Sequence, residues 1–304
     1  MSCFMLARES KFPVMSRIIL DSLEEIERLI RKQQAERKAR LLAACRRQGF
    51  PFLENRLLHT RAMLVNRKYK FVYCYAPKVA SSTLRFVMMQ LRRREDPHQS
   101  HVESIAHLNQ GDVRKILTDS SFIRFMFVRN PWSRLLSAFR DKFLNVHNMS
   151  KFPQIYWPML DKYVGLKVYD STKNGGDTLY SVPGRRHINF ENFLRFVTDG
   201  VWDTNFSNFY NEHWDLFYRL CRPCDMGYDF IGKYETFAQD YTYLMRKLGI
   251  HNLTYMALAR PHTSEEYLNN YYRMVDRQVI NKVREFYKWD FEMFGYDDYG
   301  NCTD

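Results

Sequence analysis

Runs dominated by apolar and aromatic residues occur at three places in the chain. They span residues 70–76, 122–128 and 228–232, and the first contains Phe71 to Tyr75 without a polar break. Such a run is typical of a strand buried on both faces, as in a parallel sheet. Each run leads through a short loop into a segment with helical periodicity, at about 83–94, 132–144 and 236–248. Three strand–loop–helix units predict an α/β fold around a parallel sheet.

The N-terminal part has a different pattern. Apolar residues recur at near-helical spacing from Ile18 to Ile30, basic residues follow, and Gly49-Phe50-Pro51 ends the pattern. We predict one exposed, basic amphipathic helix over 16–47, either touching a membrane surface or forming a stalk outside the main domain. The chain is therefore divided into an N-terminal segment, 1–50, and a domain, 51–304. Residues 145–186 are rich in Gly and Tyr and are interpreted as an irregular insertion.

Composition adds a charge argument. The 304 residues are 45% hydrophobic, and this content excludes a disordered chain. Their net charge of +12 suggests an anionic partner. A solvated basic surface is the alternative explanation of this charge. No run of apolar residues approaches the ~18 that a membrane span needs, and the first thirty residues lack the apolar core of a signal peptide. We therefore expect neither feature in this sequence.

The loop after the first predicted strand has the chemistry of a phosphate-binding loop. It reads Ala76-Pro77-Lys78-Val79-Ala80-Ser81-Ser82-Thr83, with one lysine, three hydroxyls and backbone donors at a helix start. It lacks the glycines of the nucleotide triphosphatase loop, in which the lysine also comes last. A kinase is therefore disfavoured. Ordinary capping of a helix by Ser and Thr explains the same residues equally well.

The loop after the second predicted strand presents an arginine and a hydroxyl. Arg129 leaves the strand at the same edge as Lys78, and Ser137 follows two helical turns later. This pair suits a second phosphate, because arginine binds phosphate oxygens through two parallel hydrogen bonds. For Arg129 alone, a surface salt bridge is the simpler interpretation.

Four stretches in order resemble one family. APKVASSTLRFVM (76–88) and FVRNPWSRLLSAFRDKF (127–143) are similar to the 5′-phosphosulfate and 3′-phosphate motifs of sulfotransferases that use 3′-phosphoadenosine 5′-phosphosulfate (PAPS). NEHWDLFYRLCRPCDMGYDFIGKYET (211–236) and REFYKWDFEMFGYDDY (284–299) are similar to later landmarks of the Golgi carbohydrate sulfotransferases that modify chondroitin, dermatan, N-acetylgalactosamine and terminal glucuronic acid. Residues 81–84 and Asn130 depart from the family's usual Cys-Thr-Asn-Trp and Asp.

The resemblance implies a fold, a cofactor and a set of site residues. The fold would be a three-layer α/β sandwich related to the P-loop kinases. Arg129 and Ser137 would hold the 3′-phosphate of PAPS, and Lys78 would also stabilise charge on the departing phosphate oxygen. No metal is required, and no cluster in the sequence has the spacing of ligands that would bind a metal for catalysis. The 5′-phosphosulfate would be held by the whole loop, that is by Lys78, Val79, Ala80, Ser81, Ser82 and Thr83.

A sugar hydroxyl needs a general base, because its pKa lies far above neutrality. His213 is the first candidate, since it matches a His-Trp pair of the family and an unperturbed histidine titrates near ~6.5. Trp214 beside it could form one wall of a sugar site. Glu212 and His187 are the runners-up. The alternative is that His213 packs beside Trp214 and orders a loop.

The cysteines of Cys221-Arg222-Pro223-Cys224 are open to three interpretations from spacing alone: a zinc half-site, a redox pair or a structural disulfide. The family resemblance favours structural cysteines in an oxidising lumen, and the simplest partner of Cys221 is Cys224. Cys74, inside a buried strand, is expected to be a free core thiol.

The compartment is not decided by the sequence. Four N-x-[ST] sequons, at Asn148, Asn205, Asn252 and Asn301, agree with a Golgi lumenal protein, whereas the membrane anchor usual in the family is missing from this sequence. A truncated chain, a secreted or cleaved form and a cytosolic protein all stay open. A membrane association would then depend on a missing or N-terminal anchor.

The sequence therefore predicts a PAPS-dependent carbohydrate sulfotransferase with a polyanionic glycan acceptor. Two alternatives are a sulfotransferase for tyrosyl peptides or small phenols, and a non-catalytic protein that binds glycosaminoglycan or nucleic acid through its charge. The ordered set of Lys78, Arg129 and Ser137 argues against the non-catalytic alternative, and no standard nucleic-acid-binding motif occurs in the chain.

Overall fold

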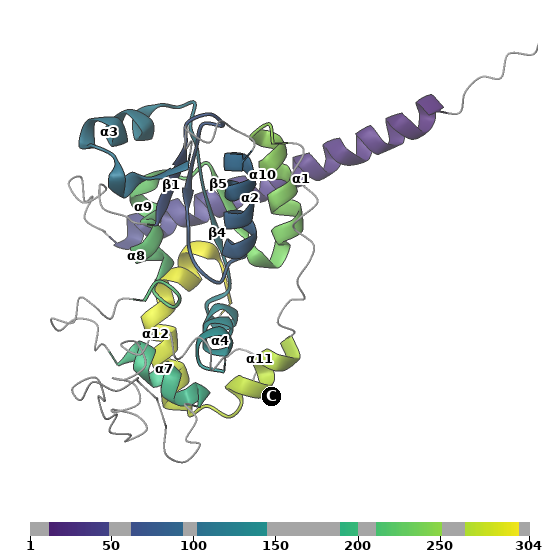
Figure 1. The fold of residues 1–304 in the computed structure, drawn as a ribbon. Helices are drawn as coiled ribbons and strands as arrows, with labels where there is room; N and C mark the ends of the chain where they lie inside the picture. The colour runs from purple at the N-terminus through teal and green to yellow at the C-terminus, as the bar shows by residue number, and fades with distance from the viewer. Residues whose placement is uncertain are drawn as a thin grey trace, which may run out of the picture.

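A computed structural model describes residues 12–48, 62–93, 102–144, 189–199, 211–250 and 265–297 of the chain. The predicted insertion at 145–186, the four sequons and His187 lie outside these residues. The structure is a mixed α/β fold. The sheet and its flanking helices form one part of the molecule, and a second group of helices forms the other part (Figure 1).

The sheet has five strands in the order β3-β1-β2-β4-β5. The three strands predicted from the sequence, β2, β4 and β5, pair in parallel, with Cys74 opposite Met126 and Phe125 opposite Phe230. The parallel core of the sheet is thus confirmed. β1 pairs antiparallel to both of its neighbours. The strands span Met63–Asn66 (β1), Phe71–Cys74 (β2), Val102–Ser104 (β3), Ile123–Val128 (β4) and Phe230–Lys233 (β5).

The helices follow the predicted pattern where the sequence showed periodicity. Those that follow β2, β4 and β5 begin within two residues of the predicted starts, because each starts at a polar or proline-containing loop. The α-helices are α1 (Phe12–Gln48), α2 (Ser81–Arg93), α3 (Gln110–Thr118), α4 (Pro131–Lys142), α7 (Phe190–Thr198), α8 (Phe217–Cys221), α9 (Pro223–Met226), α10 (Phe237–Lys247), α11 (Glu265–Tyr272) and α12 (Arg277–Phe294). Short 3₁₀ turns lie at η2 (Ile105–His107) and η5 (Tyr234–Thr236).

Helix α1 covers the outer edge of the sheet. The amide of Gln34 donates to the Ile231 carbonyl at 3.0 Å and accepts from the Ile231 N–H at 2.9 Å, so it occupies the backbone groups that an edge strand leaves open. Arg37 of the same helix pairs with buried Asp240 at 2.9 Å. The predicted helix is confirmed, but one face of its second half is not exposed, because Leu41 and Ala44 are buried against the body.

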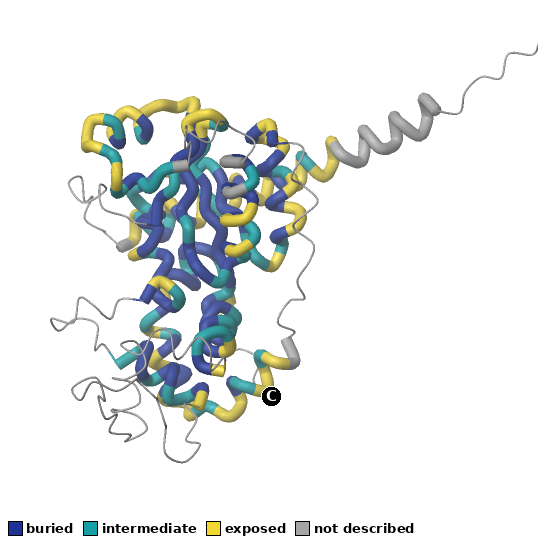
Figure 2. Tube along the Cα trace, in the orientation of Figure 1, coloured by how far each residue is buried: buried dark blue, intermediate teal, exposed yellow. Residues whose placement is uncertain are grey.

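Two hydrophobic clusters fill the interior, one around the sheet and one among the helices α4, α7, α11 and α12 (Figure 2). The sheet cluster is aromatic along its strands, where Tyr73 stacks on Phe125 with ring centroids 4.9 Å apart. Gly232 sits directly beneath the Phe127 ring, where a Cβ atom would lie 2.3 Å from the ring. Helix α4 begins at the end of β4 and reaches into the helical cluster, so it joins the two parts.

Candidate active site

The loop between β2 and α2 has an unusual backbone. Lys78 and Ala80 take left-handed conformations, with φ of 72° and 62°, although neither is glycine, and Val79 between them keeps a negative φ. A left-handed non-glycine residue costs roughly 1–2 kcal/mol. Alternation of handedness turns successive N–H groups toward one side and creates a concave anion-binding arrangement. Strain of this kind is concentrated at functional sites.

The side chain of Lys78 reaches helix α4. Its ammonium lies 3.1 Å from the Asp141 carboxylate, which also contacts the ammonium of Lys142 at 3.2 Å. Burial lowers the pKa of Lys78, while Asp141 acts in the opposite direction. Burial works to raise the pKa of Asp141, but the two ammonium groups outweigh it and the pKa lies below its ordinary value. The result is a partly buried cluster with an excess of positive charge.

Arg129 lies beside the same loop, as its place at the end of a parallel strand predicted. Its side chain is almost fully buried, Nε donates to Ser133 Oγ at 2.8 Å, and Nη1 donates to the Lys78 carbonyl at 3.2 Å. The guanidinium also lies over the ring of Tyr234, 4.1 Å from its centroid. Arg129 is therefore held by the protein on several sides and is bonded to the backbone of the loop at Lys78.

Ser137 lies between the contact points of Arg129 and Lys78 on helix α4. Residues 133, 137 and 141 follow one another at intervals of four and so share one helix face, about 6 Å apart along the axis. Arg129 contacts the first of these residues and Lys78 contacts the third. The structure thus brings together Lys78, Arg129 and Ser137, which are far apart in the sequence. Their roles toward a cofactor remain predictions.

The other predicted loop residues differ in exposure. Val79 and Ser81 are buried, Ala80 and Thr83 are half-buried, and Ser82 is exposed. The backbone N–H of Leu84 already donates to the Ala80 carbonyl at 3.1 Å, which marks the first turn of α2. Asn130, which replaces the family's usual Asp, still caps α4 by accepting the Trp132 N–H at 3.0 Å.

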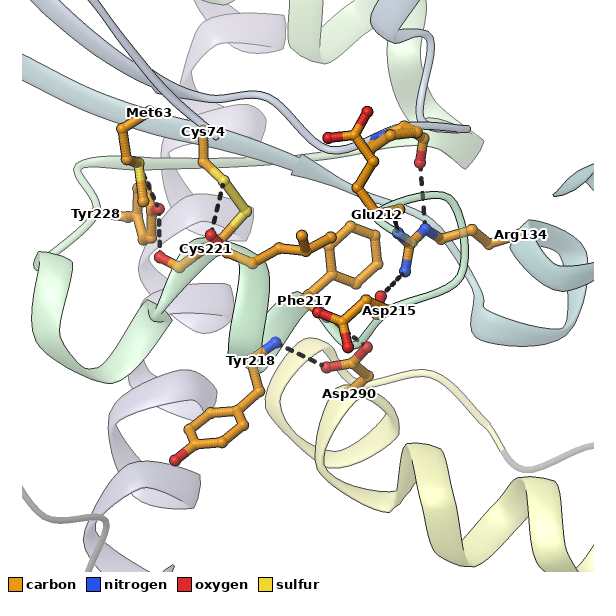
Figure 3. The surroundings of a disulfide bond; sticks show 12 residues. Met63, Cys74, Arg134, Glu212, Asp215, Phe217, Tyr218, Cys221, Tyr228 and Asp290 are labelled. Carbon is orange, nitrogen blue, oxygen red and sulfur yellow. Dashed lines mark hydrogen bonds between the residues drawn. A yellow bond between two sulfur atoms is a disulfide. The ribbon is translucent and has the colours of Figure 1, made fainter. Parts of the chain in front are cut away.

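Arg134 connects this loop to the segment 211–216 and is the main site residue that sequence reasoning missed. The guanidinium is buried, with Nε donating to the Pro77 carbonyl at 3.2 Å. Its other two nitrogens donate to the carbonyls of Asp215 and, at 2.9 Å, Glu212 (Figure 3). A buried cation among the apolar residues of a helix is a visible signal, because such a charge needs partners.

His213 is anchored in the 211–216 segment. Its ring Nδ1 lies 2.7 Å from Asn211 Oδ1, and that oxygen also accepts the His213 backbone N–H at 3.0 Å. The expectation of an unperturbed pKa near 6.5 is wrong for this structure. Burial and, after it, the cations Lys142 and Lys78 together lower the pKa of His213 to about 3, and the carboxylate of Asp141 offsets them only in part. The imidazole is neutral at neutral pH and lies in the electric field of the lysine cluster.

The neighbours of His213 differ from the expectation. Trp214 is only 2% exposed and lies in the helical core next to Phe143 and Phe193, so the predicted sugar-stacking wall is wrong. Trp214 packs inward because its large ring fills the aromatic cluster. Glu212 is the one alternative candidate for the general base that lies within the described residues. Its neighbours partly desolvate the carboxyl group and so raise its pKa, although much of the residue is exposed.

The cysteines form two disulfides, and neither is the expected one. Cys74 pairs with Cys221 and Cys45 pairs with Cys224. The prediction of structural, oxidised cysteines at 221 and 224 is confirmed, whereas the Cys221–Cys224 pairing and the free thiol at Cys74 are wrong. The two cysteines lie on successive short helices, so one faces β2 and the other faces α1. Phe217 lies between the Cys74–Cys221 bridge and the Arg134 guanidinium, which is 4.3 Å from the centroid of its ring (Figure 3).

The residues that the structure describes contain neither a candidate metal site nor a candidate membrane span. No three or more His, Cys, Asp or Glu side chains in this part of the chain group so as to hold a metal ion. None of the helices described here is long and apolar enough to span a bilayer.

Comparison with known proteins identifies the class. The sulfotransferase family matches residues 61–297, which include both loops, helix α4 and the 211–216 segment. The chain belongs to this family and is a sulfotransferase, as the four sequence motifs predicted. No solved structure matches it at a significant level.

The relatives are named as carbohydrate sulfotransferases. Carbohydrate sulfotransferase 11 of Rattus norvegicus is 30% identical over 88% of this chain and 75% of its own length. Carbohydrate sulfotransferase 14 of Homo sapiens is 29% identical, with 87% and 69% covered. Carbohydrate sulfotransferase 12 of Xenopus laevis is 28% identical, with 86% and 68% covered.

Proposed function

We propose that the protein transfers a sulfuryl group from PAPS to a hydroxyl of a sugar in a glycan. The observation that carries this proposal is the strained loop of Lys78 and Ala80, with Arg129 bound beneath its backbone and Ser137 beside it. Family membership supports the reaction, and the names of the relatives support a carbohydrate acceptor.

The residues fit PAPS as the donor. Its phosphosulfate would supply the activated sulfuryl group, and the N–H groups of residues 79–83 with the hydroxyls of Ser82 and Thr83 would hold it. Lys78 would stabilise negative charge on the departing phosphate oxygen, because a partly buried ammonium acts more strongly there than in water. Arg129 and Ser137 would hold the 3′-phosphate, the group that distinguishes this cofactor from other adenine nucleotides.

His213 is proposed as the general base. The neutral imidazole can accept the proton of a sugar hydroxyl, and it lies in the field of the lysine cluster that contacts Asp141. Anionic groups bound beside Lys78 would offset the cations that now lower the pKa of His213. The base would therefore become stronger when the donor is in place.

The acceptor is proposed to be a chondroitin- or dermatan-type chain or a terminal N-acetylgalactosamine or glucuronic acid. The net charge of +12 favours a polyanionic sugar over tyrosyl peptides or small phenols. Two disulfides support an oxidising compartment, and we propose the Golgi lumen. We also propose that residues 51–304 form the catalytic domain, with the three-layer arrangement of the P-loop kinases, and that segment 1–50 is attached to it.

The test is a transfer assay with ³⁵S-labelled PAPS and a panel of acceptors: desulfated chondroitin, desulfated dermatan, oligosaccharides that end in N-acetylgalactosamine or in glucuronic acid, a tyrosyl peptide and a small phenol. We expect label in at least one of the glycans and none in the peptide or the phenol. The matched control is Lys78→Ala, which should fold and transfer at least a hundredfold more slowly. Label in the peptide or phenol alone, or in no acceptor, would contradict the proposal.

A further inference from the structure

The hydrogen bonds of Asn211 determine which nitrogen of His213 carries a proton. The side-chain atom of Asn211 that faces the ring also faces the His213 backbone N–H, at 3.0 Å. A backbone N–H can only donate, so this atom must be the amide oxygen. The same oxygen lies 2.7 Å from ring Nδ1. Nδ1 must therefore donate, and in the neutral ring Nε2 is left with its lone pair.

Asn211 is itself held in place by its surroundings. It is 7% exposed, and its backbone carbonyl accepts the N–H groups of Trp214 and Asp215, both at 3.2 Å. Arg134 fixes the same turn through the carbonyls of Glu212 and Asp215. Because both the amide and the turn are immobilised, the imidazole cannot exchange its two nitrogens by a ring flip without losing the bond to Asn211.

We propose that Asn211 is the positioning residue of the general base: it holds His213 in the Nδ1–H form so that Nε2 accepts the proton of the acceptor hydroxyl. This inference rests on the proposed function. Nε2 takes the proton as the hydroxyl oxygen bonds to sulfur, the bond from sulfur to the 5′-phosphate oxygen breaks, and its electron pair stays on that oxygen. The imidazolium afterwards returns the proton to solvent.

The charged groups around the ring favour its neutral form. Lys78 approaches from the loop after β2, Asp141, Lys142 and Arg134 belong to α4, and Glu212 is adjacent in the chain. The cations outnumber the carboxylates, so a positively charged imidazolium is disfavoured in the free protein. A neutral amide at position 211 orients the ring without adding charge. A carboxylate there would orient it and also make it more basic.

The first test reads the tautomer without any reaction. Nitrogen-15 NMR of histidine-labelled full-length protein separates protonated from unprotonated ring nitrogens, and His213→Gln identifies the resonances of His213 among the nine histidines. We expect a protonated Nδ1 and an unprotonated Nε2. A proton on Nε2, or a mixture of both forms, would overturn the inference.

The second test uses variants at position 211. Asn211→Leu should lower kcat by roughly tenfold to a hundredfold, as the loss of a group that orients a metal-bound histidine does, with unchanged affinity for 3′,5′-adenosine bisphosphate. Asn211→Asp should keep the tautomer and retain more turnover than Asn211→Leu. It should also move the acid limb of the kcat–pH profile to higher pH than in the wild type. The matched control is Asn281→Leu, at an exposed asparagine of α12, which should leave all three readouts unchanged.

The outcomes separate the two levels of the proposal. If His213→Gln keeps wild-type turnover, His213 is not the general base, and Asn211 then has no base to position. A large loss in His213→Gln together with wild-type kcat in folded Asn211→Leu would overturn only the positioning role. If Asn211→Leu fails to fold, as a thermal melt would show, the tautomer of the wild-type protein and the pH profile of Asn211→Asp still decide the question.

Discussion

Replacing Arg134 by Met should damage both the stability and the turnover of the enzyme. Methionine has a similar length and no charge, so the change removes the donors and keeps most of the packing. The carbonyls of Pro77, Glu212 and Asp215 then lose their partner. The first carbonyl belongs to the Lys78 loop and the other two flank His213, so the two loops would no longer be joined.

The size of the effect follows from these contacts. A hydrogen bond from a charged donor contributes about 1.5–3 kcal/mol, but the two carbonyls of the 211–216 segment can relax together and do not count as independent. We therefore expect the free energy of unfolding to fall by about 3–6 kcal/mol, the contribution of two independent contacts of that size. Arg134→Lys should be intermediate, because one ammonium cannot match the fork of a guanidinium.

The assay is urea unfolding under non-reducing conditions, followed by tryptophan fluorescence, together with kcat of the folded fraction. The matched control is Arg140→Met on the same helix, whose exposed side chain packs over Tyr267. The control should change stability by less than about 0.5 kcal/mol. If Arg134→Met unfolds within about 1 kcal/mol of the wild type and keeps its kcat, Arg134 does not join the loops.

Three further predictions concern the cysteines, a buried carboxyl and the loop lysine. Peptide mapping without reduction should find the crosslinks Cys45–Cys224 and Cys74–Cys221, and a Cys221–Cys224 peptide would contradict the structure. Burial raises the pKa of Asp290 from 3.8 to about 7, so the folded state binds its proton more tightly than the unfolded state. Stability relative to Asp290→Asn should therefore fall as pH rises from about 4 to about 7, and urea midpoints that show a constant difference over this window would refute it. Lys78→Ala should lower kcat by about 10²–10³ in single-turnover experiments, and a loss below tenfold would show that its ammonium does not act on the leaving group.

The parallel core of the sheet was predictable because its strands are continuous apolar runs that lead into helices. β1 and β3 were not predicted, since they have four and three residues and the β1–β2 turn, residues 67–70, contains no glycine to mark a hairpin. The packing of α1 was also missed. It depends on Gln34 and Arg37 meeting backbone and carboxylate groups roughly 200 residues away, and helical periodicity carries no information about such partners.

The candidate site was likewise predictable from the sequence only in part. Lys78 and Arg129 were predicted to meet because parallel strands place their carboxyl ends at one edge, and their contact is confirmed. The tautomer of His213, its lowered pKa and the inward position of Trp214 depend on burial and on long-range neighbours. The disulfides were mispaired because adjacent cysteines in C-x-x-C suggest a local bridge, whereas the turn between α8 and α9 directs them to different partners.

We propose that Arg129 binds the 3′-phosphate of PAPS. Calorimetry with 3′,5′-adenosine bisphosphate and AMP tests this proposal most directly. We predict that the wild-type protein strongly prefers the bisphosphate and that Arg129→Ala loses that preference by roughly tenfold to a hundredfold. Arg140→Ala on the exposed side of α4 serves as the control and should keep it. Equal affinities of the wild-type protein for the two nucleotides would contradict the claim.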